Sequence, residues 1–360
     1  MGNMTEHVRI IADFTDGLMQ MDADGQPVPA IAESYDLSED GTVYTFHLRE
    51  DAVWSNGDPV TAADFVFGWQ RAVDPAVASE YAYMLSDIGQ VQNAAEIIAG
   101  EMDKSELGIK ALDDYTLEVT LNVPVSYFLS LMYFPTFYPV NQAFYESVGD
   151  TFATSPETTL SNGAFVLDAY EPAATAFHLT KNPDYYNADS VQLAGLNYQV
   201  IQDSQQALMS YQTGDLDITL VNGEQVDQVK DDPEFTTIGA GYLWYVSPNM
   251  DAVPELANLN IRLAMTYLSM WVTGNSNNYG LWSNAEYDAI IAECTTGDLC
   301  TDAEGRWARL YDAEKIVMDE AVIFPLYAQC NAEMVSSNVS GIEFHPVALN
   351  RVYKNAVKAE

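Results

Sequence analysis

The sequence predicts an α/β fold, because strand patterns and helix patterns alternate along nearly the whole chain. A strand, a turn and a capped helix are expected over residues 42–75, and a β-hairpin over residues 162–183. Residues 195–220 predict a strand, a helix and a second strand, which a right-handed crossover would make parallel. We therefore expect a mixed sheet with flanking helices.

The first elements are a helix and a half-buried strand. Residues 8–18 place Val8, Ile11, Phe14 and Leu18 at helical spacing, and residues 44–48 alternate between apolar and polar side chains. Residues 22–25 and 39–41 end in glycine and predict tight turns before and after the intervening segment.

The next unit is the most distinctive part of the chain. Residues 56–59, Asn-Gly-Asp-Pro, predict a turn, since Gly tolerates a positive φ and Pro ends a strand. Thr61 can then cap a helix, with Asp64 closing a capping box. The expected apolar face of this helix comprises Phe65, Val66, Trp69 and Ala72.

Further helices and strands follow. Residues 88–104 predict a helix with Val91, Ala94, Ala95 and Ile98 on one face, and residues 117–121 predict a strand. Residues 243–246 predict another strand, and residues 322–327 an apolar strand in the centre of a sheet. Two late helices are expected at the capping boxes Ser283…Glu286 and Thr301…Glu304. The second is expected to bury Trp307, Leu310, Tyr311 and Val317.

The composition indicates a globular protein that does not bind nucleic acid. The 360 residues are 48% hydrophobic and 12% aromatic, with 22 Tyr. There are 53 acidic side chains against 14 basic ones, a formal charge of −39. A nucleic-acid site needs a basic patch, and docking on anionic lipid needs the same, so both are excluded. The acids are spread along the chain, which favours a solvated surface over a site for cations.

The cysteines and the N-terminus bear on the compartment. Cys294 and Cys300 flank a short loop, so a disulfide between them is feasible, and Cys330 in an apolar run is expected to be a buried thiol. No window approaches the ~20 apolar residues of a membrane span. The first residues lack the basic start and apolar core of a signal peptide, so we expect that the export signal is absent from this chain.

No catalytic or metal motif stands out. The four histidines, His7, His47, His178 and His345, are scattered, and neither His-Glu-x-x-His nor Gly-x-Ser-x-Gly occurs. Gly239-Ala240-Gly241 lacks the third glycine of a dinucleotide loop. Paired carboxylates could serve a hydrolase, but close pairs arise by chance among 53 acids. We expect no enzyme activity, no cofactor and no metal.

Several stretches resemble, in order, the recurring stretches of one family. They are residues 29–35, 40–49, 54–75, 108–121, 162–165, 181–186, 211–217, 284–291, 306–314 and 323–327. Together they are similar to the solute-binding proteins of peptide ABC importers, namely the oligopeptide- and dipeptide-binding proteins. Residues 94–100 favour the oligopeptide-binding branch. This resemblance implies a periplasmic-binding-protein-like fold of type II, peptide-binding class.

Two departures from the family matter. Residues 260–265 resemble the start of a long helix that in relatives opens a large insertion domain, but here they continue directly into residues 266–271. By comparison with the family, we therefore expect that a block is absent near Met265, including most of the second lobe, and that the N-terminal strand is also absent. We expect a main lobe over residues 1–260, a remnant of the second lobe over 261–320, and a return to the main lobe over 321–360.

The resemblance also implies ligand contacts. The candidates are Tyr81, Tyr83, Asn222, Tyr245, Asn277, Asn278 and Tyr327. Each has a structural alternative, since tyrosines pack at cleft edges and Asn-rich loops form turns.

The implied function is capture of peptides outside the membrane and delivery to an ABC permease. A one-lobed receptor cannot exclude water from its ligand, so weakened binding is expected. The resemblance further implies an extracellular or periplasmic, envelope-associated lipoprotein acting as a monomer. The alternatives are a binding protein for another solute (a dipeptide, a metal chelate or a glycan), a carboxylate-based hydrolase, and a fragment without binding.

Overall fold

The computed structural model describes residues 5–170, 174–246, 282–295, 297, 299, 302–320, 324–345 and 351–359. The chain divides into two compact units. The first comprises Met1–Asn122, Tyr127–Ile238 and Asn331–Glu360, and the second comprises Val123–Ser126 and Gly239–Cys330. The expected missing block at Met265 lies outside the described residues.

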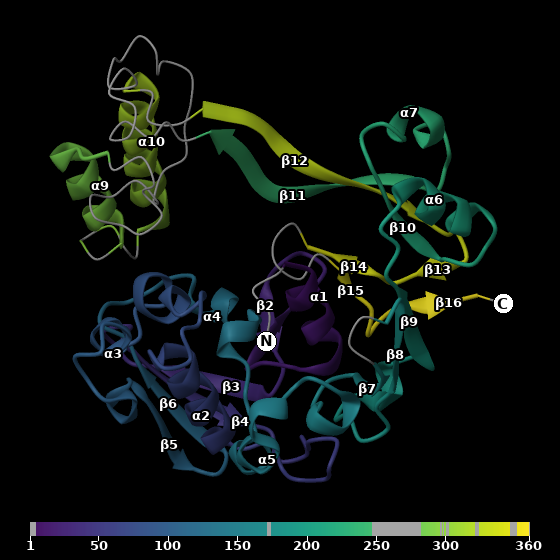
Figure 1. The fold of residues 1–360 in the computed structure, drawn as a ribbon. Coiled ribbons are helices and arrows are strands. Elements are labelled where there is room, and N and C mark those ends of the chain that lie inside the picture. Colours follow the sequence, from purple (N-terminus) through teal and green to yellow (C-terminus); the bar gives the residue numbers. More distant parts are fainter. Residues whose placement is uncertain are drawn as a thin grey trace. The chain divides into compact units, whose positions relative to one another are not determined.

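The first unit begins with a helix, a small hairpin and a four-stranded sheet (Figure 1). Helix α1 (Thr5–Phe14) ends before Leu18, which is buried at the entrance to β1 (Met19–Met21). The predicted turn at residues 22–25 joins β1 to β2 (Pro27–Pro29), with Gly25 at φ +75°. The sheet has the order β3-β4-β6-β5 and consists of β3 (Ala32–Leu37), β4 (Val43–Leu48), β5 (Ile109–Asp113) and β6 (Thr116–Thr120).

Helix α2 (Ala62–Val73) packs on this sheet and confirms the predicted capped helix. The Asp64 carboxylate accepts hydrogen bonds from the Thr61 backbone N–H at 2.8 Å and from the Trp54 indole at 3.2 Å. Burial raises the pKa of Asp64. The buried face is centred on Ala62, Phe65, Trp69 and Val73, while Val66 and Ala72 are only half-buried.

The segment after α2 is less helical than expected. A π-helix, η1 (Met84–Ile88), precedes a short α3 (Ala94–Ile98), because Asn93 (φ +65°) and Gly100 (φ +75°) interrupt the pattern on either side. The predicted helix over 88–104 is therefore wrong in length, and its buried side is Val91, Ala94 and Ile97. Short elements follow: η2 (Lys104–Glu106), α4 (Phe128–Leu131), η3 (Pro135–Phe137), α5 (Gln142–Val148), η4 (Gly149–Thr151) and η5 (Pro156–Thr158).

A second sheet has the order β7-β8-β9. Its strands are β7 (Phe165–Ala169), β8 (Ala176–Lys181) and β9 (Gly195–Gln199), with η6 (Ala188–Ser190) between the last two. The antiparallel pairing of Phe165 with Lys181 confirms the predicted hairpin. Burial of Phe165 and Leu179 against Phe14 attaches this sheet to α1.

The predicted parallel strand-helix-strand unit is wrong. Helix α6 (Ser204–Gln212) has the expected Asp203 cap, but it connects strands of two different sheets. Strand β9 pairs antiparallel with β8, whereas β10 (Ile218–Val221) pairs antiparallel with β12 (Phe324–Val335). The third sheet has the order β10-β12-β11, which places the predicted apolar strand at its centre. Helix α7 (Val226–Val229) leads into β11 (Phe235–Val246), which contains the predicted strand at 243–246.

The second unit contains helices α9 (Ala285–Thr295) and α10 (Ala303–Asp319). Their caps lie one residue later than predicted, at Asn284 and Asp302. Ala313 and Val317 are buried as part of the core between the helices, but Trp307 is 72% exposed and Tyr311 69% exposed. Tyr311 follows the partly buried Leu310 by one residue, about 100° around the helix, and Trp307 lies on the same side. Both side chains therefore fall beside the face that Ala313 and Val317 bury, so their predicted burial is wrong.

The cysteines also differ from expectation. Cys294 is a buried free thiol whose Sγ contacts the Arg306 carbonyl oxygen at 3.8 Å. The feasible bridge to Cys300 involves a residue outside the described ranges. Cys330 is exposed on β12, not buried, because neighbouring strand residues face opposite sides. The chain closes with the short strands β13 (Val339–Ser340), β14 (Glu343–Phe344), β15 (Arg351–Val352) and β16 (Val357–Lys358).

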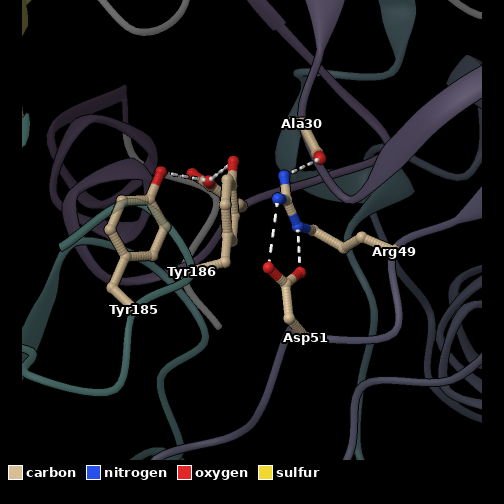
Figure 2. A network of polar contacts seen from close by, with 6 residues as sticks. Ala30, Arg49, Asp51, Tyr185 and Tyr186 are labelled. Carbon is tan, nitrogen blue, oxygen red and sulfur yellow. Dashed lines mark hydrogen bonds and ion pairs between the residues drawn. The ribbon is translucent and has the colours of Figure 1, made fainter. Parts of the chain in front are cut away.

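Two buried carboxylates connect the parts of the first unit. Asp13 lies in the last turn of α1, and Asp16 lies two residues after the helix ends. Asp16 accepts hydrogen bonds from the hydroxyls of Tyr185 and Tyr186, both at 2.8 Å, and Figure 2 shows these hydroxyls converging. The Arg49 guanidinium lies 3.6 Å from the Tyr186 ring centroid and donates to Asp51 and to the Ala30 carbonyl (Figure 2). Burial raises the pKa of both tyrosines, so they remain donors at neutral pH.

Asn162 and Asp13 complete this group, which we call the α1 hub (Asp13, Asp16, Asn162, Tyr185, Tyr186 and Tyr198). Asn162 exchanges two bonds with the Asp16 backbone, at 2.9 and 3.1 Å. A Cβ on the next residue, Gly163, would lie 2.7 Å from the Phe14 carbonyl carbon, so this close approach requires glycine. Asp13 is 4% exposed and accepts a hydrogen bond from the Tyr198 hydroxyl of β9.

Substitution of Asp16 tests the hub. We expect Asp16→Ala to lower the free energy of unfolding by about 2–4 kcal/mol, because two buried tyrosine hydroxyls lose their acceptor. Urea denaturation followed by circular dichroism measures this loss. Exposed Asp150 provides the control, and Asp150→Ala should change stability by less than about 0.5 kcal/mol. An equal effect of the two substitutions would contradict the hub.

Asp13 makes the stability depend on pH. Burial raises its pKa from 3.8 to about 7, so the folded protein holds a proton that the unfolded chain releases. Its contribution to the free energy of unfolding should therefore fall as pH rises from 4 to 7 and stay constant above. Asp13→Asn removes this dependence. Relative to the wild type, the variant should gain about 2 kcal/mol between pH 5.5 and pH 8 in urea titrations. A pH-independent difference would show that Asp13 titrates normally.

Candidate ligand-binding site

Five of the seven predicted contact residues belong to the part of the chain that the structure describes, where they lie in three places. Tyr81 and Tyr83 follow α2, and Asn222 follows β10. Tyr245 and Tyr327 lie in β11 and β12. Asn277 and Asn278 lie outside the described residues.

Tyr81 and Tyr83 belong to an aromatic cluster. Their ring centroids are 6.1 Å apart, and Tyr81 meets Phe134 edge-on at 5.4 Å. Both tyrosines are half-buried, and burial together with neighbouring Tyr81 and Asp87 raises the pKa of Tyr83. Such rings offer a flat apolar face with a polar tip, a combination suited to small-molecule or peptide contact.

Tyr81 also lines a cavity of about 340 Å³ in the first unit. The walls come from α2, from the loop after it, from residues 134–141 and from α5. They include Trp54, Phe134, Tyr138, Phe144 and Phe152, and Arg71 is the charged residue among them. Binding sites for small molecules begin at about this volume and are mostly apolar with few polar groups.

Asn222 has its polar atoms engaged within its own turn. Its Oδ1 accepts from the backbone N–H groups of Glu224 and Gln225, both at 3.0 Å. Its Nδ2 donates to the Ser204 hydroxyl at 2.7 Å, which joins the start of α6 to the end of β10. The contact of Asn222 with a ligand stays a prediction. The observed hydrogen bonds show that the Asn222 side chain stabilises the turn after β10.

Three predicted residues lie in or next to the third sheet, Asn222 in the first unit and Tyr245 and Tyr327 in the second. Asn222 directly follows β10, while Tyr245 and Tyr327 lie on β11 and β12 of the same sheet. The sequence had suggested each of these residues separately, and it gave no sign that Tyr245 and Tyr327 lie on neighbouring strands of one sheet. For Tyr245 and Tyr327 the structure describes the strand to which each belongs but not the side chain.

The described residues show no metal or catalytic cluster. Within the described ranges, no group of three His, Cys, Asp or Glu side chains is placed to hold a metal ion. His47 pairs with Asp36 at 2.8 Å and His178 with Asp168 at 2.6 Å, each on the surface. Neither pair lines the cavity. The sequence analysis did not identify Arg71 or the α1 hub. Arg71 could have been noticed, because basic residues are rare in so acidic a chain.

Comparison with known proteins is consistent with this architecture. A sequence model described as bacterial extracellular solute-binding proteins, family 5 Middle, matches residues 26–269. The probable deoxycholate-binding periplasmic protein YgiS of Escherichia coli is 41% identical over 62% of this chain and 41% of its own length. The dipeptide-binding protein of Lactococcus lactis is 35% identical over 71% of this chain and 48% of its own length.

A solved structure extends the likeness to the whole chain. Listeria monocytogenes OppA bound to peptide superposes with a TM-score of 0.86 and 26% identity, covering 100% of this chain and 96% of that one. By contrast, the chain spans less than half the length of each of the two curated relatives named above.

The fold and the family match define a solute-binding protein of the type found in these relatives. The predicted periplasmic-binding-protein-like α/β fold is confirmed. The chain belongs to the bacterial extracellular solute-binding proteins of family 5. In the described part of the chain, no helix has the length and apolar character that membrane crossing requires.

The turn at Asn222 can be tested directly. Asn222→Ala should lower the free energy of unfolding by about 1–2 kcal/mol, because two backbone N–H groups lose their acceptor. Asn222→Asp keeps both acceptors and loses only the donor to Ser204, so its effect should be less than half as large. Thermal or urea denaturation separates the two variants, and an unchanged Asn222→Ala would rule out this stabilisation of the turn.

Proposed function

We propose that this chain acts as the substrate-binding component of an ABC importer, capturing peptides outside the membrane and delivering them to a permease. The observation that carries the proposal is the likeness, over the whole chain, to a peptide-bound solute-binding protein. The 35% identical dipeptide-binding protein supports the same ligand class. The relatives are binding proteins, and we propose that this chain likewise performs no covalent chemistry.

Backbone recognition would suit such a ligand. Peptides of different sequence share N–H and C=O groups, which strand-like hydrogen bonding recognises regardless of side chain. The proposed contacts are Tyr245 and Tyr327 of the third sheet, with Asn222 at the end of β10 and Tyr81 and Tyr83 after α2. Asn277 and Asn278 remain part of the proposal. Tyrosines would add apolar area and hydrogen bonds at low entropic cost.

A shortened second lobe would weaken this binding. We propose that a block is absent near Met265, so that residues 1–260 and 321–360 form the main lobe and residues 261–320 a remnant. Binding proteins of this kind close two lobes over the ligand and remove it from water. Without a complete second lobe, water competes for each hydrogen bond, and the dissociation constant should lie above about 10 μM.

The remaining properties follow from the same role. We propose a monomer at the outer face of the cell envelope, in the periplasm or as a lipoprotein, working with a membrane permease and without nucleic acid or cofactor. The charge of −39 agrees with exclusion from nucleic acid and from anionic lipid surfaces.

A second candidate is a binding protein for a non-peptide solute. The observation that favours it is the 41% identity to a relative whose name gives deoxycholate as its ligand. The same fold would then present its aromatic side chains to an amphipathic molecule rather than to a peptide backbone.

Calorimetric titration separates these candidates. Mixed tri- to pentapeptides should release heat with a dissociation constant above about 10 μM, a free energy weaker than about −7 kcal/mol. Tyr245→Ala should weaken the binding further, whereas Tyr35→Ala, which removes an exposed tyrosine of β3, should not. Heat with deoxycholate but not with peptides would replace the first candidate by the second. Submicromolar peptide binding would contradict the proposed loss of closure.

A further inference from the structure

The cavity of about 340 Å³ has a chemistry of its own. Its walls contain no Asp or Glu, although the chain has 53 of them. The charged group that faces it is Arg71, in the last turn of α2. A cavity that has aromatic rings, a few neutral polar side chains, one cation and no acid in its walls is unusual on a chain of charge −39.

Arg71 has aromatic neighbours in place of carboxylates. Its guanidinium carbon lies 5.0 Å from the Tyr145 ring centroid and 6.0 Å from that of Phe152. Its Nε is buried without a hydrogen-bond acceptor, and among the described residues no carboxylate lies within ion-pair distance of it. The arginines Arg49, Arg309 and Arg351 each pair with a carboxylate. Arg71 therefore differs from them.

The missing group is an anion. A guanidinium presents five donors in a planar fork that fits a carboxylate, and a buried donor without a partner costs free energy. Water could accept hydrogen bonds from these donors, but the aromatic side chains of the cavity would then stay in contact with water, which is unfavourable for apolar surface. A molecule with a carboxylate at one end and an apolar body at the other satisfies both the cation and the walls.

We propose that this cavity is a second binding site, which shares only Tyr81 with the proposed peptide contacts, for a small monocarboxylate with an aromatic or branched apolar body. The carboxylate would accept from Arg71, while the body would pack among Phe134, Tyr138, Phe144 and Phe152. The site lies within the first unit and uses no residue of the third sheet. It extends beyond the proposed function, since a ligand here is neither a peptide backbone nor cargo held by two lobes.

A matched pair of ligands tests the proposal on the wild-type protein. Phenylacetate and phenylacetamide have nearly the same shape, but only phenylacetate carries a charge at neutral pH. Calorimetry, or the fluorescence of Trp54 in the cavity wall, should show phenylacetate binding at least about tenfold tighter. The overall charge of −39 repels anions, so a preference for the anion must come from a local cation.

Variants locate the site. Arg71→Gln should reduce phenylacetate affinity at least about tenfold and abolish the preference over the amide. Lys110→Gln removes one positive charge from an exposed position on β5 and should change neither. Peptide titrations of Arg71→Gln should match the wild type, so failure of the peptide proposal is distinguishable from failure of this one.

Three results would overturn the proposal. They are no binding of phenylacetate, 4-methylpentanoate or indole-3-acetate, equal binding of acid and amide, or equal loss in Arg71→Gln and Lys110→Gln. If Arg71→Gln does not fold, the comparison of acid with amide on the wild type still decides between a carboxylate site and a merely apolar one. Retained carboxylate preference in a folded Arg71→Gln would also refute the role of Arg71.

Discussion

The first unit depends on how it accommodates buried carboxylates. Asp13 and Asp16 are 4% and 8% exposed, and ionised groups buried without partners are costly. Tyrosine hydroxyls solve this problem, because they donate hydrogen bonds while their rings bury apolar area. Tyr185 and Tyr186 reach Asp16 across 169 and 170 residues of sequence, and Tyr198 reaches Asp13 across 185. The end of α1 is thereby tied to the sheet β7-β8-β9 at several points.

The same group reaches the sheet β3-β4-β6-β5. Arg49, which follows β4, stacks on Tyr186 and bonds the Ala30 carbonyl in front of β3. At the start of α2, which packs on this sheet, the Asp64 carboxylate accepts hydrogen bonds from the Trp54 indole and from the Thr61 backbone N–H. The stretch that most clearly marks the family, residues 54–75, therefore carries structural bonds and, through Arg71, one wall of a cavity. This stretch therefore indicates the family of the protein more directly than it indicates the identity of the ligand.

Local pattern was sufficient for elements whose partners lie nearby in sequence. The capped helix α2, the hairpin β7–β8 and the central position of β12 followed from alternation, turns and caps. Pattern failed where a distant partner decides. The strands flanking α6 joined two different sheets, which no local spacing could show. Trp307 and Tyr311 are apolar but lie one step beside the buried stripe. For the site, the sequence supplied the residues, but only the fold placed Tyr245 and Tyr327 on neighbouring strands of one sheet.

Native-state hydrogen exchange tests the central claim most directly, namely that the α1 hub makes the first unit one cooperative body. Amide exchange of the intact chain would be followed by mass spectrometry at increasing urea concentrations below the unfolding midpoint. The account predicts that α1, β3–β6 and β7–β9 open together, with one free energy and one urea dependence. Opening of β7–β9 at a clearly lower free energy, with α1 and β3–β6 still protected, would contradict it.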